Sequence, residues 1–495
     1  MISGVVGKSY RPWAPLQGFL LPPSPTEWLP DGHLAYFILD VVDELDLGAI
    51  EAVIATKDPR GERPYSPRML AALLMYGYCV GVFSSRRLAR ATYEDVAIRV
   101  LAGGSHPHFT TINEFRLTHG PALGDLFVQG LGMCARAGLV ELGHVSVDGT
   151  KILANASKHK AMSYKRMKDE ETRLQQEVQS LLQQADQADR QEDETYGAGK
   201  DPWCDVPEEL RRRETRLARI RAMKAELEQE AAQARANELR AQAAQQREKA
   251  ADPSVDSVVR KRSRTRAAKS EAKARDLDGG DDSDGSGTGD LPSHRVPHNP
   301  DGTPTPDAQR NFTDADSRIM VKGGSWVQAY NAQIVVDEAA QVIVAQAVTN
   351  QSPDTEHLVP MLRRVRIGLG EGPRRASADS GYYTNSNVEY CENNGVDAYI
   401  SVGRIRHSGE KTGFNALAHP GPTRDRMVEK LSSRLGRAFY RRRKVIVEPP
   451  FGQIQAARGF RRFSVRGVKK VRLEWSLVCL THNLLKLFRL AWRPV

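Results

Sequence analysis

A short run of alternating side chains, His144 to Thr150, sets the first constraint on how this chain folds. Val145 and Val147 would point to one face of a strand and Asp148 to the other, because successive strand residues alternate. Gly149 then lets the backbone leave the extended path. A turn aspartate that bonds its own backbone is the ordinary alternative for a single match of this kind. The pattern predicts a strand that carries one carboxylate to the edge of a sheet.

Two further acids close strand-like or apolar runs. Asp379 ends the run that begins at Ala376, and Glu448 follows an apolar run and precedes Pro449. Three carboxylates at such positions could hold two Mg²⁺ ions. Hard cations prefer carboxylate oxygens, and a two-metal site stabilises both the attacking and the leaving oxygen of phosphoryl transfer. Spacing alone does not select these three acids from the others.

Several blocks of sequence together carry a family resemblance. They are VSVDGTKILAN at 145–155, the stretch 311–337, ADSGYY at 378–383, and the stretch 442–487. These blocks resemble the DDE transposases of bacterial insertion sequences, most closely the IS1182 group within the IS4/IS5-like superfamily. The resemblance covers most of 31–167 and 310–490. It implies a catalytic core with the ribonuclease H-like fold.

The resemblance also implies site residues and a cofactor. The catalytic and metal-binding acids of the family correspond to Asp148, Asp379 and Glu448, with two Mg²⁺ ions for which Mn²⁺ may substitute. The chain departs from the family pattern after the glutamate. It has Pro449-Pro450 where relatives commonly have one proline, and Gln455 where they have a lysine that helps to hold DNA phosphate. Lys444, Arg458 and Arg461 are the candidate replacements for that charge.

Charge and cysteine content narrow the class of protein. The 495 residues carry a formal net charge of +10, which favours a polyanionic partner such as double-stranded DNA. The five cysteines form no C-x-x-C pair, which argues against a disulfide scaffold and a thiolate zinc site. No export signal, membrane span or nucleotide-binding loop is apparent, so we expect a cytoplasmic protein without a nucleotide cofactor.

The N-terminal part predicts a DNA-binding domain. Residues 1–30 are rich in proline and are expected to form an extended arm, whereas 31–140 show helical periodicity. Short helices with cationic exposed faces are typical of helix-turn-helix readers, although a helical bundle with solvated arginines fits equally well. The resemblance favours DNA. The candidate contacts are Arg86, Arg87, Arg90, Asn113 and Arg116 here, and Lys444, Arg458, Arg461 and Arg462 near the acids.

A long polar interruption separates two parts of the expected catalytic domain, 141–167 and 311–490. Residues 168–251 predict a helical hairpin, because leucine and isoleucine recur every three or four positions among charged residues. Residues 252–310 combine a basic run with an acidic, glycine- and proline-rich one, and predict a disordered linker. The insertion is therefore expected outside the core.

The pattern after residue 310 predicts a mixed sheet. Antiparallel strands are expected at 317–322, 327–336 and 341–349, then a helix at 354–369, a strand at 374–379, a helix from Asn385 to Gly395, and a strand at 398–402. The expected fold class is α+β or α/β, a ribonuclease H-like mixed sheet flanked by helices.

The function expected from these observations is that of a DDE transposase. It would bind the terminal inverted repeats of its element, cut DNA and join a free 3′-OH to target DNA, as a homodimer or higher assembly. Two alternatives share the fold: a transposase-derived DNA-binding protein without catalysis, and a metal-dependent nuclease without strand transfer.

Overall fold

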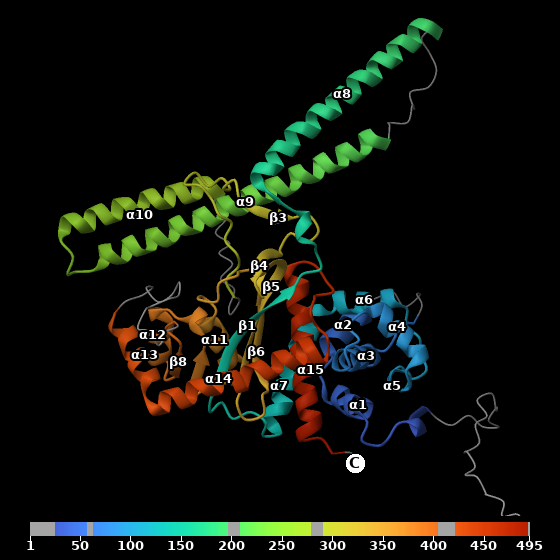
Figure 1. Ribbon diagram of the computed structural model, residues 1–495, viewed down its shortest axis with the longest axis vertical. Coiled ribbons are helices and arrows are strands. Elements are labelled where there is room, and N and C mark those ends of the chain that lie inside the picture. Colours follow the sequence, from blue (N-terminus) through green and yellow to red (C-terminus); the bar gives the residue numbers. More distant parts are fainter. Residues whose placement is uncertain (1–24, 57–62, 197–207, 279–290, 404–420, 494–495) are drawn as a thin grey trace, which may run out of the picture.

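The computed structural model describes residues 25–56, 63–196, 208–278, 291–403 and 421–493. A mixed sheet lies at the centre with helices packed around it, the N-terminal helices lie to one side, and three long helices project away (Figure 1). Within the described ranges, no helix combines the length and the apolar character needed to cross a membrane.

The central sheet has six strands in the order β4-β5-β1-β7-β8, with β6 also paired to β5. The strands β1, β7 and β8 run parallel to one another, and β5 runs antiparallel to β1, β4 and β6. The strands predicted from the sequence are confirmed within a few residues at each end. Their bounds are β1 Val145–Leu153, β4 Arg318–Lys322, β5 Ser325–Asp337, β6 Ile343–Thr349, β7 Arg375–Ala378 and β8 Asp397–Ile400.

Helices cover both faces of this sheet. Asp148 contacts α14, whereas the neighbouring Gly149 faces Gln333, which bonds Asp354 just before α11. Because adjacent strand residues point to opposite faces, α14 and the segment leading to α11 lie on opposite sides of β1. The surrounding elements are α11 Leu358–Leu369, the 3-10 helix η3 Ser380–Tyr382, α12 Asn385–Asn393, α13 Pro422–Ser432, α14 Arg434–Gly452, the π-helix Gln453–Ala457 and α15 Val468–Leu490.

The helix α14 corrects the expectation that Glu448 ends a strand-like run. The apolar residues before Glu448 lie inside α14, where Ile446 and Val447 are buried against the sheet. A short run of β-branched residues looks the same in a strand and in a buried helix, so its pattern could not distinguish them. Pro449 and Pro450 also lie within α14, although proline has no N–H to continue the helix bonding. The helical path then continues as the π-helix.

The N-terminal helices share one core with the C-terminal helix α15. Residues of α3 and α7 pack against α15, and a Cβ on Gly130 of α7 would lie only 2.4 Å from a methyl carbon of Leu480. Glycine at this position thus allows the two helices to pack closely. The helical periodicity predicted over 31–140 is confirmed. The elements are η1 Pro25–Trp28, α1 Leu34–Glu44, α2 Gly48–Ala55, α3 Pro67–Cys79, α4 Ser85–Glu94, α5 Val96–Leu101, α6 Phe109–Thr118 and α7 Gly120–Arg136.

The insertion leaves and rejoins the domain at one point. After the short helix η2 (Lys158–Lys160), β2 (Ala161–Ser163) pairs antiparallel with β3 (Gln309–Asn311). Between these strands, α8 (Tyr164–Tyr196) and α9 (Glu208–Ala251) form the two predicted helices of the insertion, and they contact each other. The paired strands fix the base of the projecting arm (Figure 1).

The prediction of disorder throughout 252–310 is wrong in two parts. Ser257–Asp278 form a third long helix, α10, and within 291–310 the side chains of Val296 and Ala308 are buried and the chain ends in β3. The helix α10 packs along α9 through small apolar side chains, and the Arg247 guanidinium lies 2.7 Å from the Glu271 carboxylate. Alanine contacts bury little apolar surface per residue, so the seam between the two helices was hidden in a highly charged sequence. Residues 279–290 of the predicted linker lie outside the described residues. The buried residues of the seam are Ala236, Leu239 and Ala274.

A buried ion pair joins the N-terminal helices to α15. Arg116 of α6 lies 3.5 Å from the Glu474 carboxylate, and these side chains are 10% and 1% exposed. The Arg116 guanidinium also donates to the Tyr78 hydroxyl and to Ser464 Oγ, both at 3.0 Å. Tyr78 in turn donates to Glu474 at 3.0 Å. The expected exposure of Arg116 is therefore wrong, because its charge is used inside the protein.

We expect Arg116→Ala to lower the free energy of unfolding by about 3–5 kcal/mol, because it leaves the Glu474 carboxylate buried without its cation. Urea unfolding followed by circular dichroism would measure this change. Arg87→Ala is the matched control, since Arg87 is an exposed arginine of the same group of helices, and it should change stability by less than about 0.5 kcal/mol. Equal effects of the two substitutions would contradict a structural role for Arg116.

Candidate active site

The register of two parallel strands places Asp148 beside Asp379. Val147 of β1 is the partner of Ala378 of β7, and this is the last pair in their ladder. The next residue on each strand is an aspartate. The strand register thus brings together two acids that the family resemblance assigns to one site, although they are 231 residues apart (379 − 148).

Asp148 is a largely buried carboxylate with one cation beside it. Burial and, after it, the negative charge of Asp379 raise the pKa of Asp148 to about 6. Arg443 of α14 opposes this rise, with its Nη1 atom 3.2 Å from Asp148 Oδ2. The Gly149 amide donates to Asp148 Oδ1 at 2.8 Å and acts in the same direction. Two like charges at this edge of the sheet therefore favour an additional cation.

Asp379 caps the 3-10 helix η3. Its Oδ1 atom accepts a hydrogen bond from the Gly381 amide at 2.8 Å. Burial raises the pKa of Asp379, and the charge of Asp354 adds to this effect, while the Gly381 amide, Arg443 and Lys151 oppose it. The carboxylate is therefore fixed in orientation by the turn that follows the strand.

Glu448 lies on the same helix as Arg443 but has an exposed side chain. Within the described ranges, no set of three or more His, Cys, Asp or Glu side chains has an arrangement that could hold a metal ion. The structure thus brings together Asp148 and Asp379, and it places Glu448 on the helix that packs over them without joining it to the pair.

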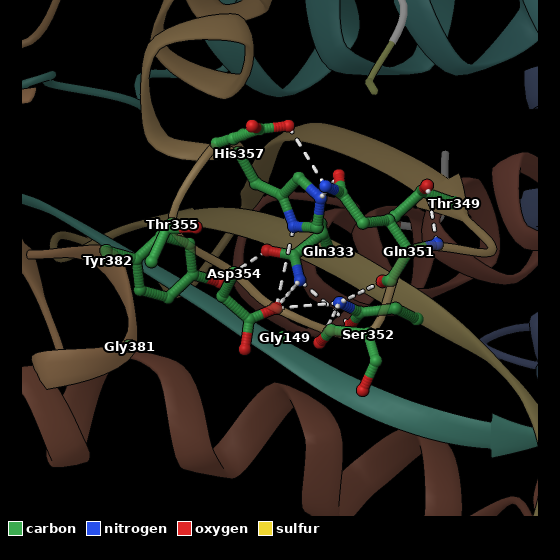
Figure 2. A network of polar contacts seen from close by, with 12 residues as sticks. Gly149, Gln333, Thr349, Gln351, Ser352, Asp354, Thr355, His357, Gly381 and Tyr382 are labelled. Atoms are coloured by element: carbon green, nitrogen blue, oxygen red, sulfur yellow. Dashed lines mark hydrogen bonds and ion pairs between the residues drawn. The ribbon is translucent and has the colours of Figure 1, made fainter. Parts of the chain in front are cut away.

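A fourth acid, Asp354, lies close to this pair and was not identified from the sequence. Its Oδ1 atom accepts hydrogen bonds from Asn331 at 2.7 Å and Gln333 at 2.8 Å, and Lys151 lies 3.5 Å away (Figure 2). Burial alone would raise the pKa of Asp354, but the contacts with His357, Lys151 and Asn331 outweigh burial and lower it. Asp354 precedes a helix in a polar segment, where nothing in the pattern distinguishes it from a solvated acid.

Gly149 makes this network possible. A Cβ at residue 149 would lie 2.0 Å from Gln333 Nε2 and 3.0 Å from Asn331 Oδ1, so a side chain there would displace both amides. Gln333 also accepts a hydrogen bond from the Tyr382 hydroxyl. The prediction that Gly149 releases the strand is wrong, because β1 continues through it to Leu153 and stays paired with β5. The role of Gly149 is instead to admit Gln333 to the space beside Asp354 (Figure 2).

The residue in the family's lysine position, Gln455, contacts a lysine from another strand. Gln455 Nε2 donates to Thr150 Oγ1 at 3.1 Å, and Lys322 Nζ donates to Gln455 Oε1 at 3.3 Å. Burial and the nearby charge of Arg461 lower the pKa of Lys322. A cation is thus present here, although it comes from β4 and not from the three candidates named from the sequence.

The predicted DNA-binding residues fall into two groups. Arg458 is buried and donates to Thr481 Oγ1 at 2.8 Å and to the Val478 carbonyl at 3.1 Å, so like Arg116 it stabilises the interior. Asn113 is half-buried and accepts a hydrogen bond from Arg116 at 2.9 Å. The remaining candidates are exposed: Arg86, Arg87, Arg90, Lys444, Arg461 and Arg462.

We expect the raised pKa of Asp148 to make metal-free protein less stable as pH rises. Between the ordinary value of 3.8 and about 6, the folded protein keeps a proton that the unfolded chain releases. In EDTA, the free energy of unfolding of wild type relative to Asp148→Asn should therefore fall by up to about 3 kcal/mol across this range, at 1.36 kcal/mol per pKa unit. Urea unfolding at several pH values would measure it.

The matched control for this experiment is Asp397→Asn. Burial tends to raise the pKa of Asp397, but hydrogen bonds from Lys430 and Tyr399 lower it, so its contribution changes below pH 3.8. The difference between wild type and this variant should stay flat between pH 4 and 6. A flat difference for Asp148→Asn as well would contradict the raised pKa.

Comparisons with known proteins were consistent with this geometry. Residues 293–484 match the family model of a transposase DDE domain, a range that includes Asp379 and Glu448 but not Asp148. Residues 23–117, which span α1 to α6 apart from the last residue of α6, match a second transposase domain of uncharacterised role. No curated protein and no solved structure matched the chain. Both family matches are to transposase domains, and together they support a transposase function for this chain.

Proposed function

We propose that this protein is a DDE transposase that binds the terminal inverted repeats of its own element, cleaves DNA and transfers the freed strand to a target. The observation that carries the proposal is the register of β1 and β7, which places Asp148 beside Asp379. The strand order supports a ribonuclease H-like core, since a parallel β1-β7-β8 half is joined to an antiparallel β5 and β6 half. The resemblance to the IS1182 group supports the finer family assignment.

The proposed cofactor is a pair of Mg²⁺ ions, for which Mn²⁺ may substitute. The two partly buried aspartates fit such ions, because carboxylates that repel each other provide the oxygen ligands preferred by hard cations. When bound, such ions stabilise the attacking and leaving oxygens of phosphodiester cleavage. Asp148, Asp379 and Glu448 are proposed to hold them.

The remaining residues of the site orient these acids. The Gly149 and Gly381 amides fix one oxygen of each aspartate, which leaves the second oxygen of each for another ligand. Arg443 occupies the second oxygen of Asp148 and must yield it when a metal ion binds. Glu448 lies five residues after Arg443 and on a different side of α14, so it would face the pair only if the helix turned about its axis.

We expect Asp148→Asn, Asp379→Asn and Glu448→Gln each to abolish cleavage while DNA binding remains within about threefold of wild type, because DNA affinity rests chiefly on cationic contacts with phosphates. Labelled DNA carrying the element ends, incubated with Mg²⁺ or Mn²⁺, would be scored for nicks and for joined products. Nicks without joined products would favour the nuclease, and binding without nicks the non-catalytic protein.

Thermal unfolding with and without Mg²⁺ distinguishes a variant that no longer binds the metal from one that binds it but no longer cleaves DNA. Mg²⁺ should raise the melting temperature of wild type, because a ligand that binds only the folded state stabilises it by mass action. The three carboxylate variants should lose this increase. Asp397→Asn should keep both the increase and the cleavage, since Asp397 is at the other end of β8 in an exposed contact with Lys430. Full activity of Asp379→Asn would exclude the proposed site.

The exposed arginines of α4 are proposed to read the terminal repeat, whereas the cations near the acids hold phosphates. Arg86 also stacks on the Phe109 ring at 4.7 Å, which links α4 to the start of α6.

The proposed assembly on two element ends is a homodimer or larger. No nucleotide cofactor is part of the proposal.

We expect substitutions of the α4 arginines to change sequence discrimination, and substitutions of the cations near the acids to change affinity for DNA of any sequence. Arg86→Ala or Arg87→Ala should reduce discrimination between terminal-repeat and scrambled duplexes by about 1–3 kcal/mol. Lys444→Ala or Arg461→Ala should instead weaken binding to both duplexes alike and lower the salt slope by about one unit. Anisotropy titrations over a salt series would measure both quantities. Equal weakening of both duplexes by the α4 variants would make this domain a non-specific clamp.

A further inference from the structure

A groove of about 750 Å³ lies at the far end of β1, beyond the candidate active site. One wall is the chain from 154 to 160, and the opposite wall is the start of β5, 325–328. Arg462 and Arg466 complete the lining. The segment containing Arg462 is attached to β1 by a bridge to Leu153, so the groove is continuous with the central sheet.

The charged side chains that line this groove are all basic. Lys158, Lys160, Arg462 and Arg466 contribute to it, and no aspartate or glutamate does. All four side chains are exposed, and among the described residues none of them forms an ion pair with an acid. Arg466 Nε donates to the Asn155 carbonyl at 3.0 Å, which fixes its guanidinium at the groove. Four unneutralised cations in one hollow favour an anionic ligand with several charges.

An exposed indole lies among these cations. The Trp326 side chain is 62% exposed, and its partner across the β4–β5 hairpin, Val321, is 49% exposed. A large aromatic surface in water is unfavourable, yet nothing in the described part of the chain covers it. Bases stack on such surfaces with little regard to sequence, because every base has an aromatic face. Within a duplex those faces are already stacked on neighbouring bases, so the indole fits an unpaired base.

We propose that this groove holds a DNA strand that carries an unpaired nucleotide, with its phosphates on the four cations and its base stacked on Trp326. The identity of the ligand as DNA rests on the proposed function. The position agrees with it, because β1 runs from Asp148 to Leu153, five residues or about 17 Å at 3.3 Å per residue. A DNA strand that runs from the proposed catalytic carboxylates along β1 would reach the groove within about five nucleotides, at 3.4 Å per nucleotide.

The test compares two probes in EDTA, where no cleavage interferes: a blunt duplex, and the same duplex with a three-nucleotide single-stranded overhang. Wild type should bind the overhang probe more tightly by roughly 5- to 100-fold, the range expected for stacking of one base. Trp326→Ala should lose this preference, and Trp326→Phe should recover part of it. Trp28→Ala is the matched control, since Trp28 is 51% exposed outside the groove, and it should keep the full preference.

The phosphate contacts have their own readout. Lys158→Gln and Arg462→Gln should each lower the salt slope for the overhang probe by about one unit. Arg366→Gln, an exposed arginine of α11 outside the groove, should leave the slope unchanged. A third result would be a lowered salt slope in Lys158→Gln and Arg462→Gln together with a full overhang preference in Trp326→Ala. The groove would then bind phosphates only, and the assignment of an unpaired base to Trp326 would be overturned.

Two further outcomes would overturn the inference. One is a wild-type protein that binds both probes equally. The other is a Trp326→Ala protein with a smaller assembly in light scattering and an unchanged overhang preference, which would assign Trp326 to a contact between copies. Failure of the inference about the groove can be distinguished from failure of the proposed function. Asp148→Asn should keep the overhang preference even though it cannot cleave, and a groove without a ligand would leave Mg²⁺-dependent cleavage intact.

Discussion

The parallel pairing of β1 with β7 is the constraint on which the rest of the site depends. Its last pair, Val147 with Ala378, forces the following two aspartates to share one edge of the sheet. Burial and mutual repulsion both oppose ionisation of Asp148. The surrounding groups that counter this cost are the Arg443 guanidinium, the Gly149 amide and, near Asp379, the Gly381 amide. The fold thus holds two like charges close together, and a bound cation would reduce the repulsion between them.

A hydrogen-bond network on the other face of β1 holds the surrounding elements in position. Gln333 of β5 donates to Asp354, which precedes α11, and accepts from Tyr382 of η3. One side chain therefore connects a central strand to the segment before α11 and to η3 (Figure 2). This arrangement depends on Gly149, because a Cβ there would occupy the position of the Gln333 amide. Buried polar networks of this kind specify one packing when all members are satisfied.

The chain adds two units to the sheet in different ways. The N-terminal helices are joined to α15 by a shared core and by the Arg116–Glu474 pair, so they cannot separate without exposing buried charge. The helical arm instead leaves and returns through β2 and β3 and has small apolar clusters of its own. Buried arginines and exposed arginines therefore have different functions. Arginines between packed units stabilise the fold, whereas Arg87 on α4 and Arg462 in the groove are exposed and available for phosphates.

The sequence by itself determined the order of strands and helices, because alternation and turn signals are local properties. Asp148 and Asp379 were singled out by the family resemblance of the sequence, not by their spacing. The sequence also indicated the extent of the insertion. Only the tertiary structure decided that Glu448 lies on a helix, that α10 is ordered against α9, and that Arg116 and Arg458 are buried. The same holds for Asp354, Lys322 and Trp326, which reach their sites through partners far away in the chain. Burial and pairing depend on those distant partners, and a local pattern contains no information about them.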